Sequence, residues 1–293
     1  MKVGVIGPII QDVNIYGNQK IEQAGGVTFY SGCALDSLGV DVTIFGSCGE
    51  TVPEFPESFK GNIIHLLKQG TTTHTNITPE NEPDKRYDQA IVYDNSILPQ
   101  DISTSDLDDL DHIVLGPMFH SQIGLELVKK LNGTPVSLAP QGMIRYIEGQ
   151  NTYPQSGEFI RKFNQDVYEI LPYVDNVFLD ANELVIISGK QQTDKGAAKL
   201  LDSGAKTIIV TQGQKGSLIY TNSQKIQVPA FPVEVINPIG AGDSYMAGYI
   251  AAEQQHYKDL ENRGKFAAHV ASKSLQSSGP FKGTVDEILE LMN

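Results

Sequence analysis

Residues 235–248 combine an apolar run, a proline and two glycines that flank an alanine with an aspartate that opens a helix of small residues. Glycine lets the main chain approach a ligand closely, and the unpaired first N–H groups of a helix attract anions. Asp243, placed there, could accept a proton from a substrate hydroxyl while the amides of Gly240, Ala241 and Gly242 hold a phosphoryl group. The alternative is a glycine-rich turn whose aspartate only caps a helix, because Asp is a preferred N-cap and Gly a preferred turn residue.

The residues around this stretch favour the functional interpretation. The segment resembles the second signature of the ribokinase-like (PfkB) carbohydrate kinases, in which Gly-Ala-Gly-Asp precedes a small residue and Phe. Asn237 stands where the family usually has Asp, and Tyr245 where it has Phe. The resemblance implies that Asp243 is the general base of a phosphotransferase that uses ATP and Mg²⁺, with an anion hole at Gly240–Gly242. Some relatives bind a monovalent cation through the first Asp, so the amide of Asn237 predicts that potassium does not activate this protein.

A second resemblance lies at Ala24–Gly39, where a Gly-Gly pair opens a small-residue helix that ends in Leu-Gly. It is similar to the family's first signature, with Tyr30 where Asn is common, and it implies that Gly25 and Gly26 form the floor of a substrate site. Asp12 follows the first expected strand, and the family uses an acid there to bind substrate hydroxyls. A carboxylate that accepts two hydroxyl hydrogen bonds suits a polyol ligand. From the residues alone, Asp12 is equally well a solvated loop acid.

Two further segments point to a nucleotide. The run from Asp180 to Glu183 resembles the family's Asn-x-x-Glu motif, with Asp in place of Asn. It implies that Glu183 places Mg²⁺ through water, since Mg²⁺ keeps several waters and takes few carboxylates; the alternative is an acid favoured by a helix dipole. The turn that contains Thr211, Gly213 and Gly216 resembles a turn that borders the nucleotide in the family, and is otherwise an ordinary hairpin turn.

Polar residues also follow the expected strand Val136–Leu138. Many of these kinases have Gln-x-x-x-Arg here, facing the substrate or the phosphoryl group, which makes Gln141 and Arg145 candidate ligands. Ala139 stands where an Asp is common. A structural salt bridge is the other interpretation of Arg145. Arg86, on the proposed lid, is a further candidate.

Short apolar runs alternate with helix-like stretches, the pattern of a mainly parallel sheet covered on both faces. The expected strands are Lys2–Ile6, Val42–Phe45, His112–Leu115, Val136–Leu138, Val177–Leu179, Lys206–Val210 and Ser217–Tyr220. The expected helices are Gly26–Leu38, Ile123–Leu131, Glu158–Leu171, Asp194–Leu201 and a last one from the capping box at Thr284 to Met292.

Two segments, near 9–23 and 71–95, break the alternation, and each reads as two strands around a polar turn, at 16–18 and 79–85. They are either edge hairpins of the main sheet or, as the resemblance implies, a small β lid over the site. The loop at Gly149–Gly157 is expected to be an exposed connection. For residues 1–293 the resemblance implies a single α/β domain, a ribokinase-like three-layer α/β/α sandwich with a mainly parallel sheet and this lid.

Composition excludes several classes of protein. A formal net charge of −13 argues against a general binder of nucleic acid or of anionic membranes. No apolar run approaches membrane-spanning length, and residues 1–7 lack the features of a signal peptide. The two cysteines, Cys33 and Cys48, form no metal-binding spacing, and the six histidines are expected in ordinary surface or supporting roles. We therefore expect a cytoplasmic protein.

The expected function is transfer of a phosphoryl group from ATP to a hydroxyl of a small sugar, an inositol-like polyol or a nucleoside. The alternative from another class is a catalytically silent, ligand-binding relative with a regulatory role, because Asn237, Asp180 and Ala139 all depart from the family pattern. Retention of Asp243 and its glycines argues against that alternative, since a binder needs no base. Exposed lid edges could also pair two copies into a homodimer.

Overall fold

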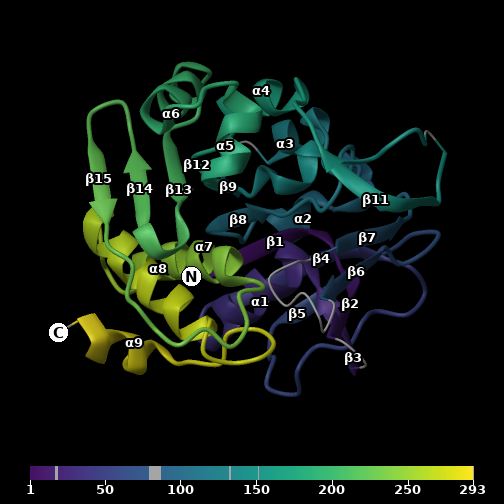
Figure 1. Cartoon of the computed structure of the whole chain (residues 1–293), viewed down its shortest axis with the longest axis horizontal. Coiled ribbons are helices and arrows are strands. Elements are labelled where there is room, and N and C mark those ends of the chain that lie inside the picture. Colours follow the sequence, from purple (N-terminus) through teal and green to yellow (C-terminus); the bar gives the residue numbers. More distant parts are fainter. Residues whose placement is uncertain (17–18, 79–86, 132, 151, 293) are drawn as a thin grey trace.

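The computed structural model describes residues 1–16, 19–78, 87–131, 133–150 and 152–292 (Figure 1). Within them, nine strands form one sheet in the order β15-β14-β13-β12-β9-β8-β1-β4-β5. All neighbours from β5 to β13 are parallel, and β14 and β15 are added antiparallel. The strands are β1 (Lys2–Pro8), β4 (Asp41–Cys48), β5 (Asn62–Leu67), β8 (His112–Leu115), β9 (Val136–Leu138), β12 (Asn176–Asp180), β13 (Thr207–Thr211), β14 (Ser217–Tyr220) and β15 (Lys225–Val228).

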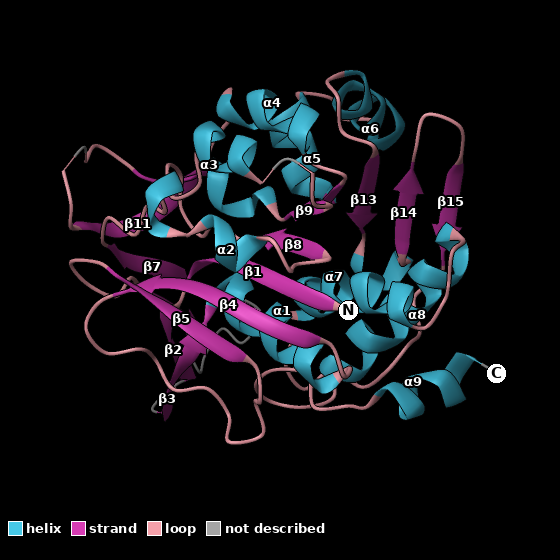
Figure 2. Ribbon diagram, turned by 180° about the vertical axis from the view of Figure 1, so that it is seen from behind, coloured by secondary structure: helices cyan, strands magenta, loops and turns pink. Residues whose placement is uncertain are grey.

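Helices cover both faces of this sheet (Figure 2). One layer holds α1 (Gly26–Ser37), α7 (Ala241–Gln254), α8 (Leu260–Ser274) and α9 (Val285–Met292). The other holds α2 (Thr104–Leu107), α3 (Leu125–Lys130), α4 (Asp166–Ile170), α5 (Ala181–Ser188) and α6 (Thr193–Asp202). Short 3₁₀ turns are η1 (Pro99–Asp101), η2 (Pro140–Ile144), η3 (Leu171–Tyr173) and η4 (Gly213–Lys215).

Strand side chains alternate between two hydrophobic cores, one under each helical layer. Val3 and Val5 of β1 pack with α1 and α7, whereas Ile6 packs into the core that lies beneath α3 to α6. A parallel strand buried on both faces reads as a continuous apolar run, and for this reason the main strands are recognisable in the sequence. The fold is therefore the expected three-layer α/β/α sandwich.

A second sheet, called the lid sheet below, is separate from the first. It has the order β10-β11-β7-β6-β2-β3 in the described part of the chain. Its strands are β2 (Ile10–Tyr16), β3 (Gln19–Gly25), β6 (Thr73–Thr78), β7 (Tyr87–Val92), β10 (Arg145–Ile147) and β11 (Gln155–Arg161). The segments near 9–23 and 71–95 supply four of these strands, and they do not extend the main sheet as edge hairpins. Of the turn expected at 16–18, Tyr16 belongs to β2 and residues 17–18 lie outside the described residues, as do the turn expected at 79–85 and Arg86.

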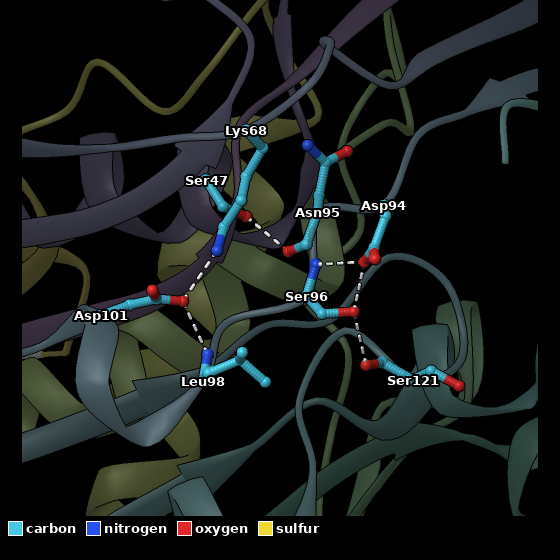
Figure 3. A network of polar contacts seen from close by, with 8 residues as sticks. All are labelled: Ser47, Lys68, Asp94, Asn95, Ser96, Leu98, Asp101 and Ser121. Atoms are coloured by element: carbon cyan, nitrogen blue, oxygen red, sulfur yellow. Dashed lines mark hydrogen bonds and ion pairs between the residues drawn. The ribbon is translucent and has the colours of Figure 1, made fainter.

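Polar contacts fix the place where the chain returns from the lid sheet to the core (Figure 3). Ser47 Oγ, at the end of β4, donates to the main-chain oxygen of Asn95 at 2.8 Å, and the Asn95 amide donates to Gly70 O at 2.9 Å. Nearby, Lys68 and Asp101 form an ion pair at 2.7 Å. The base of the lid sheet is thus bound to the carboxyl ends of β4 and β5.

One sequence prediction was wrong in this region. Residues 158–171 were expected to be one helix, but the first four belong to β11 and the helix α4 begins only at Asp166. The exposed connection expected at Gly149–Gly157 likewise ends in β11, which pairs with β7 and β10. In β11, Phe159 and Arg161 lie two residues apart on one face of the sheet, which is the repeat of a strand. The segment is too short for this repeat to distinguish a strand from a helix in the sequence.

Five elements were not expected at all: β5, β10, β15, α2 and α8. The capping box predicted at Thr284 is confirmed, because Thr284 N donates to Glu287 Oε2 at 2.8 Å and Glu287 N to Thr284 Oγ1 at 3.3 Å. Across the described ranges, no helix is long and apolar enough to cross a membrane.

Candidate active site

The amino-terminal end of α7 is shaped by the glycine that precedes it. Gly240 is the N-cap with φ of 79°, and a Cβ built on it would lie 2.4 Å from Cδ1 of Tyr30. Both the backbone conformation and the space therefore require glycine. The first regular helical bond runs from Ser244 N to Gly240 O at 2.8 Å, and no side chain of a described residue caps the helix. The first turn of α7 thus presents amides that suit an anion.

The three amides of the expected anion hole are not equivalent. Ala241 N already points to Pro238 O, although 3.4 Å is long for a hydrogen bond. A Cβ on Gly242 would meet no atom within 4 Å, so this residue borders open space. The main chain at Gly242 is thus the part of the turn that a ligand can approach most closely.

These residues border a cleft of about 190 Å³ at the carboxyl ends of β9, β12 and β13. Parallel sheets bind ligands at this edge. Seven of the residues selected from the sequence line it: Gln141, Glu183, Thr211, Gly240, Ala241, Gly242 and Asp243. Phe178, Pro238 and Met246 supply apolar walls. The fold therefore brings together side chains from four separate segments of the chain.

Asp243 has the electrostatics of a base. Its pKa is raised to about 7, chiefly by burial; the charge of Arg145 opposes this shift, and the charges of Glu183 and Asp12 contribute to it. Efficient proton transfer needs a pKa near the working pH. The carboxyl is therefore able to exchange a proton with an alcohol near neutral pH.

Glu183 and Asp180 form a capping box at the start of α5. Asp180 Oδ1 accepts from the amides of Asn182 at 2.7 Å and Glu183 at 2.8 Å, and Glu183 Oε2 accepts from Asp180 N at 3.0 Å. Burial and the charge of Asp180 raise the pKa of Glu183. The structural interpretation of this acid is thus correct, and because both carboxylates also line the cleft, it does not exclude a role toward a bound cation.

A second cavity of about 680 Å³ adjoins the cleft and shares Thr211, Pro238, Ala241 and Gly242 with it. Its further lining is mostly apolar: Gly213, Gln214, Gly216, Ala230, Phe231, Pro232, Val233, Val235, Tyr245, Ala268, Ala271, Ser272 and Leu275. Gly213 and Gly216 have φ of 56° and 84°, so their type is required by the turn between β13 and β14. All three residues expected beside a nucleotide line this cavity, whereas the Lys215 side chain is exposed.

Two of the remaining substrate candidates, Asp12 and Gly25, belong to strands of the lid sheet, and Gly26 follows directly. Asp12 on β2 is 3% exposed, and a Cβ on Gly25 would lie 2.1 Å from its Oδ2, so Gly25 makes room for this carboxylate. Gly26, with φ of 85°, opens α1 against Met118 and is structural. Its expected place on the floor of a substrate site finds no support in the described contacts.

Two contacts hold the side chain of Arg145, which belongs to β10 of the lid sheet. Its Nη2 donates to Gln141 Oε1 at 2.6 Å, and its guanidinium lies 5.3 Å from the centre of the Phe159 ring. Burial lowers the pKa of Arg145, and the charges of Glu183 and Asp243 act in the opposite direction. The described salt bridges give Arg145 no structural ion pair, so its charge is directed at the acids around the cleft.

Sequence reasoning missed Phe159, Arg161 and His74, which lie around Arg145. Arg161 lies directly opposite it in the β10–β11 pair and 5.5 Å from the same Phe159 ring. His74 on β6 packs edge-on against Phe159 at 5.5 Å. The sequence gives only a weak sign of them, because β6 is polar at nearly every position and therefore shows no clear alternation.

Comparisons with known proteins agree with this geometry. A family model described as pfkB family carbohydrate kinase matches residues 141–286, about half of the chain. A nucleoside kinase of Methanocaldococcus jannaschii is 47% identical over 73 residues, which cover 25% of this chain and 24% of that protein. A cytidine kinase of Thermococcus kodakarensis is 29% identical over 165 residues, covering 55% and 54%. The chain thus spans between about a quarter and about half of the length of these relatives.

Solved structures extend the likeness of fold to the whole chain. A pyrophosphate-dependent kinase of the ribokinase family, solved as a sulfate complex, superposes with a TM-score of 0.82 at 19% identity, covering 98% of this chain and 99% of that one. The carboxyl-terminal half carries the family match, and the architecture holds from end to end. The chain therefore belongs to the PfkB family of carbohydrate kinases and has the ribokinase-like fold.

Proposed function

We propose that this protein transfers the terminal phosphoryl group of ATP to a hydroxyl of a small sugar, an inositol-like polyol or a nucleoside. The observation that carries the proposal is the position of the α7 amino terminus. Gly242 borders both cavities, and Asp243, with a pKa raised to about 7, lines the smaller one. A phosphoryl group at Gly242 would face a donor on one side and an acceptor hydroxyl near the base on the other.

In this reaction Asp243 takes the proton of the attacking hydroxyl. The amides at the start of α7 and the buried guanidinium of Arg145 stabilise the negative charge of the transferring group. Thr211 and the turn at Gly213–Gly216 border the donor, and Asp12 binds hydroxyls of the acceptor. Closure of the lid sheet over the cleft would exclude water and limit hydrolysis of the donor.

The acids of the cleft suit Mg²⁺ only as a partner of the donor's phosphates. Among the described residues, no group of three or more His, Cys, Asp or Glu is placed to hold a metal by itself. Mg²⁺ commonly takes one or two protein carboxylates and completes its shell with phosphates and water. Glu183 would hold the ion through water, and the ion, when bound, neutralises phosphate charge.

The larger cavity supports a nucleotide as the donor. Its lining is apolar and it is more than three times as large as the phosphate cleft, a shape and chemistry that suit a nucleobase and ribose. Inorganic pyrophosphate, the donor named for the structural neighbour, would leave such a cavity unused. The names of the nucleoside and cytidine kinases support a nucleoside among the candidate acceptors.

Product analysis tests both donor and acceptor. The purified protein, Mg²⁺ and either ATP or pyrophosphate are incubated with sugars, polyols and nucleosides, and ADP or phosphate release is coupled to a dye. We expect release of ADP that depends on one acceptor class and is lost in Asp243→Asn. Tight acceptor binding by calorimetry without any turnover would instead support the silent, regulatory alternative.

The whole of residues 1–293 is proposed to act as one kinase domain. Tyr87 and Ile91 of β7 are 43% and 45% exposed on the lid sheet, and we propose that this surface pairs two copies into a homodimer. Cys33 and Cys48 are buried and unpaired, which suits a reducing compartment such as the cytoplasm.

A further inference from the structure

His74 lies between two carboxylates on the lid sheet. It pairs in register with Asp12 across β6 and β2, and its Nδ1 is 3.5 Å from Asp12 Oδ1. On the other side, its Nε2 is 3.4 Å from Oδ1 of Asp88 on β7. His74 is 6% exposed and Asp12 3%. One imidazole therefore separates the acid expected to bind the acceptor from a second acid one strand away.

The two neighbouring carboxylates determine how many protons the imidazole of His74 should carry. An ionised carboxylate only accepts hydrogen bonds, and a neutral imidazole carries a single N–H and one bare nitrogen. A neutral His74 would thus turn a lone pair toward one of the two acids, within a site shielded from water. An imidazolium donates from both nitrogens and satisfies both acids.

The surrounding charges act in the same direction. Burial by itself would lower the pKa of His74, but the adjacent carboxylates of Asp12 and Asp88 outweigh burial, and the pKa is raised above its ordinary value. The charge of Arg145, on β10, opposes the shift. From β11 the ring of Phe159 packs against the imidazole edge-on and brings no charge.

The distances from His74 to Asp12 and to Asp88 are long enough to shorten into hydrogen bonds. Asp12 Oδ1 and His74 Nε2 are buried, and neither has a hydrogen-bond partner among the described residues. Ion-pair distances of 3.4 and 3.5 Å exceed those of a charge-assisted hydrogen bond, about 2.7–2.9 Å. A small movement of β6 toward β2, or of the acceptor against Asp12, would close them.

We propose that His74, as an imidazolium, is a positioning residue that fixes the ionised carboxylate of Asp12 for the acceptor's hydroxyls and ties it to Asp88 on the adjacent lid strand. The inference rests on the proposed function for the role of Asp12. Acceptor binding is then strongest while His74 is protonated, and it weakens as the pH rises through the pKa of His74.

The protonation state is tested without reference to activity. The chain has six histidines, so ¹⁵N-imidazole NMR shifts can be followed residue by residue, with His74→Gln used to assign the His74 signal. His112 is the internal reference, because burial lowers its pKa to about 4 and it stays neutral near pH 7. We expect His74 to show two protonated nitrogens at pH 7. A His74 that is neutral at pH 7, like His112, would overturn the proposal.

Kinetics test the positioning role. In His74→Gln we expect the acceptor KM at pH 6.5 to rise about tenfold or more, the cost of losing a charged hydrogen-bond partner, with kcat and the donor KM within about threefold. The natural protein should show a rise of acceptor KM at alkaline pH, and this rise should disappear in the variant. His256→Gln, at an exposed histidine, is the matched control and should change neither value.

The outcomes separate this inference from the proposed function. An unchanged acceptor KM with an unchanged pH dependence in His74→Gln would refute the positioning role, even if the protein is an active kinase. If the natural protein phosphorylates no acceptor, the proposed function fails while the NMR result still decides the protonation state. If His74→Gln does not fold by circular dichroism, Asp88→Asn replaces it, and the His74 pKa must then fall and the acceptor KM rise.

Discussion

Replacing Gly242 by alanine should separate stability from activity. The structure offers no reason for glycine at this position other than a ligand, because φ is ordinary and an added Cβ would meet no protein atom within 4 Å. Alanine is a better helix former than glycine by about 0.5–1 kcal/mol in a helix interior, and somewhat less in a first turn. We therefore expect Gly242→Ala to fold normally, with its melting temperature unchanged or raised by about 1–2 °C.

Activity should change in the opposite direction. The new methyl group would enter the cleft where the amides of α7 meet the transferring phosphoryl group. Misaligning one donor of such an anion hole costs about 10²–10³-fold in kcat. The matched control is Gly124→Ala at the N-cap of α3, another position with open space and negative φ, which lines neither cavity. It should keep full activity.

The assay is steady-state phosphoryl transfer alongside thermal melting of the same preparations. If Gly242→Ala keeps the natural kcat and KM while folding normally, no phosphoryl group lies against Gly242 and the proposed site is wrong. If it unfolds instead, the open space beside Gly242 is not there, and the argument from the fold is refuted.

Three further predictions concern charge. Asp243→Asn should lower kcat by about 10²–10⁴-fold. Because burial raises the pKa of Asp243 to about 7, the carboxyl's contribution to stability is present below about 3.8 and is lost as the pH rises through about 7. The Asn variant should therefore melt higher than the natural protein at pH 8, and this gap should narrow toward pH 4; an equal gap at both values would contradict the shift. The natural protein's kcat should rise with pH to a plateau above about 7. Glu183→Gln keeps an acceptor for Asp180 N and removes a charge, so the Mg²⁺ needed for half-maximal rate should rise about tenfold with an unchanged melt, and an unchanged Mg²⁺ titration would remove Glu183 from the metal site. The Asn237 side-chain oxygen already accepts from Ile239 N at 3.0 Å, so rates in potassium and sodium salts should be equal, and a strong potassium dependence would show that a cation binds there.

The strands that carry the site are readable from the sequence because they are buried on both faces. β8 and β9 occur at the residues expected, and each is apolar or small throughout apart from His112 at the start of β8. The order of the elements along the chain then predicts the fold, because apolar runs that alternate with helices allow few other topologies. The same logic places Gln141, Glu183 and Thr211 at one edge of the sheet, since each lies at or just beyond the carboxyl end of a parallel strand.

The lid sheet is only half predictable. β11 contains a glycine with φ of 140° and alternates poorly, so its residues were assigned to a loop and a helix. Its strand state comes from pairing with β7 and β10, and the pairing with β7 in particular joins segments distant in sequence and leaves no local signal. For the same reason His74 was assigned an ordinary role. Nothing in one strand of sequence reveals that its neighbours on both sides present acids.

The glycines show most clearly what the sequence alone cannot reveal about the site. The sequence marks several glycines around the site and treats them alike, but the structure gives each a different reason. Gly216 is required by its positive φ, and Gly25 leaves room for the Asp12 carboxylate. Gly240 is required for both reasons, because its φ is positive and the Tyr30 ring leaves no space for a Cβ. Gly242 is required by neither backbone nor neighbours. A residue that the folded chain does not itself explain is best explained by something that the chain binds, and here that position is the first turn of a helix beside a base.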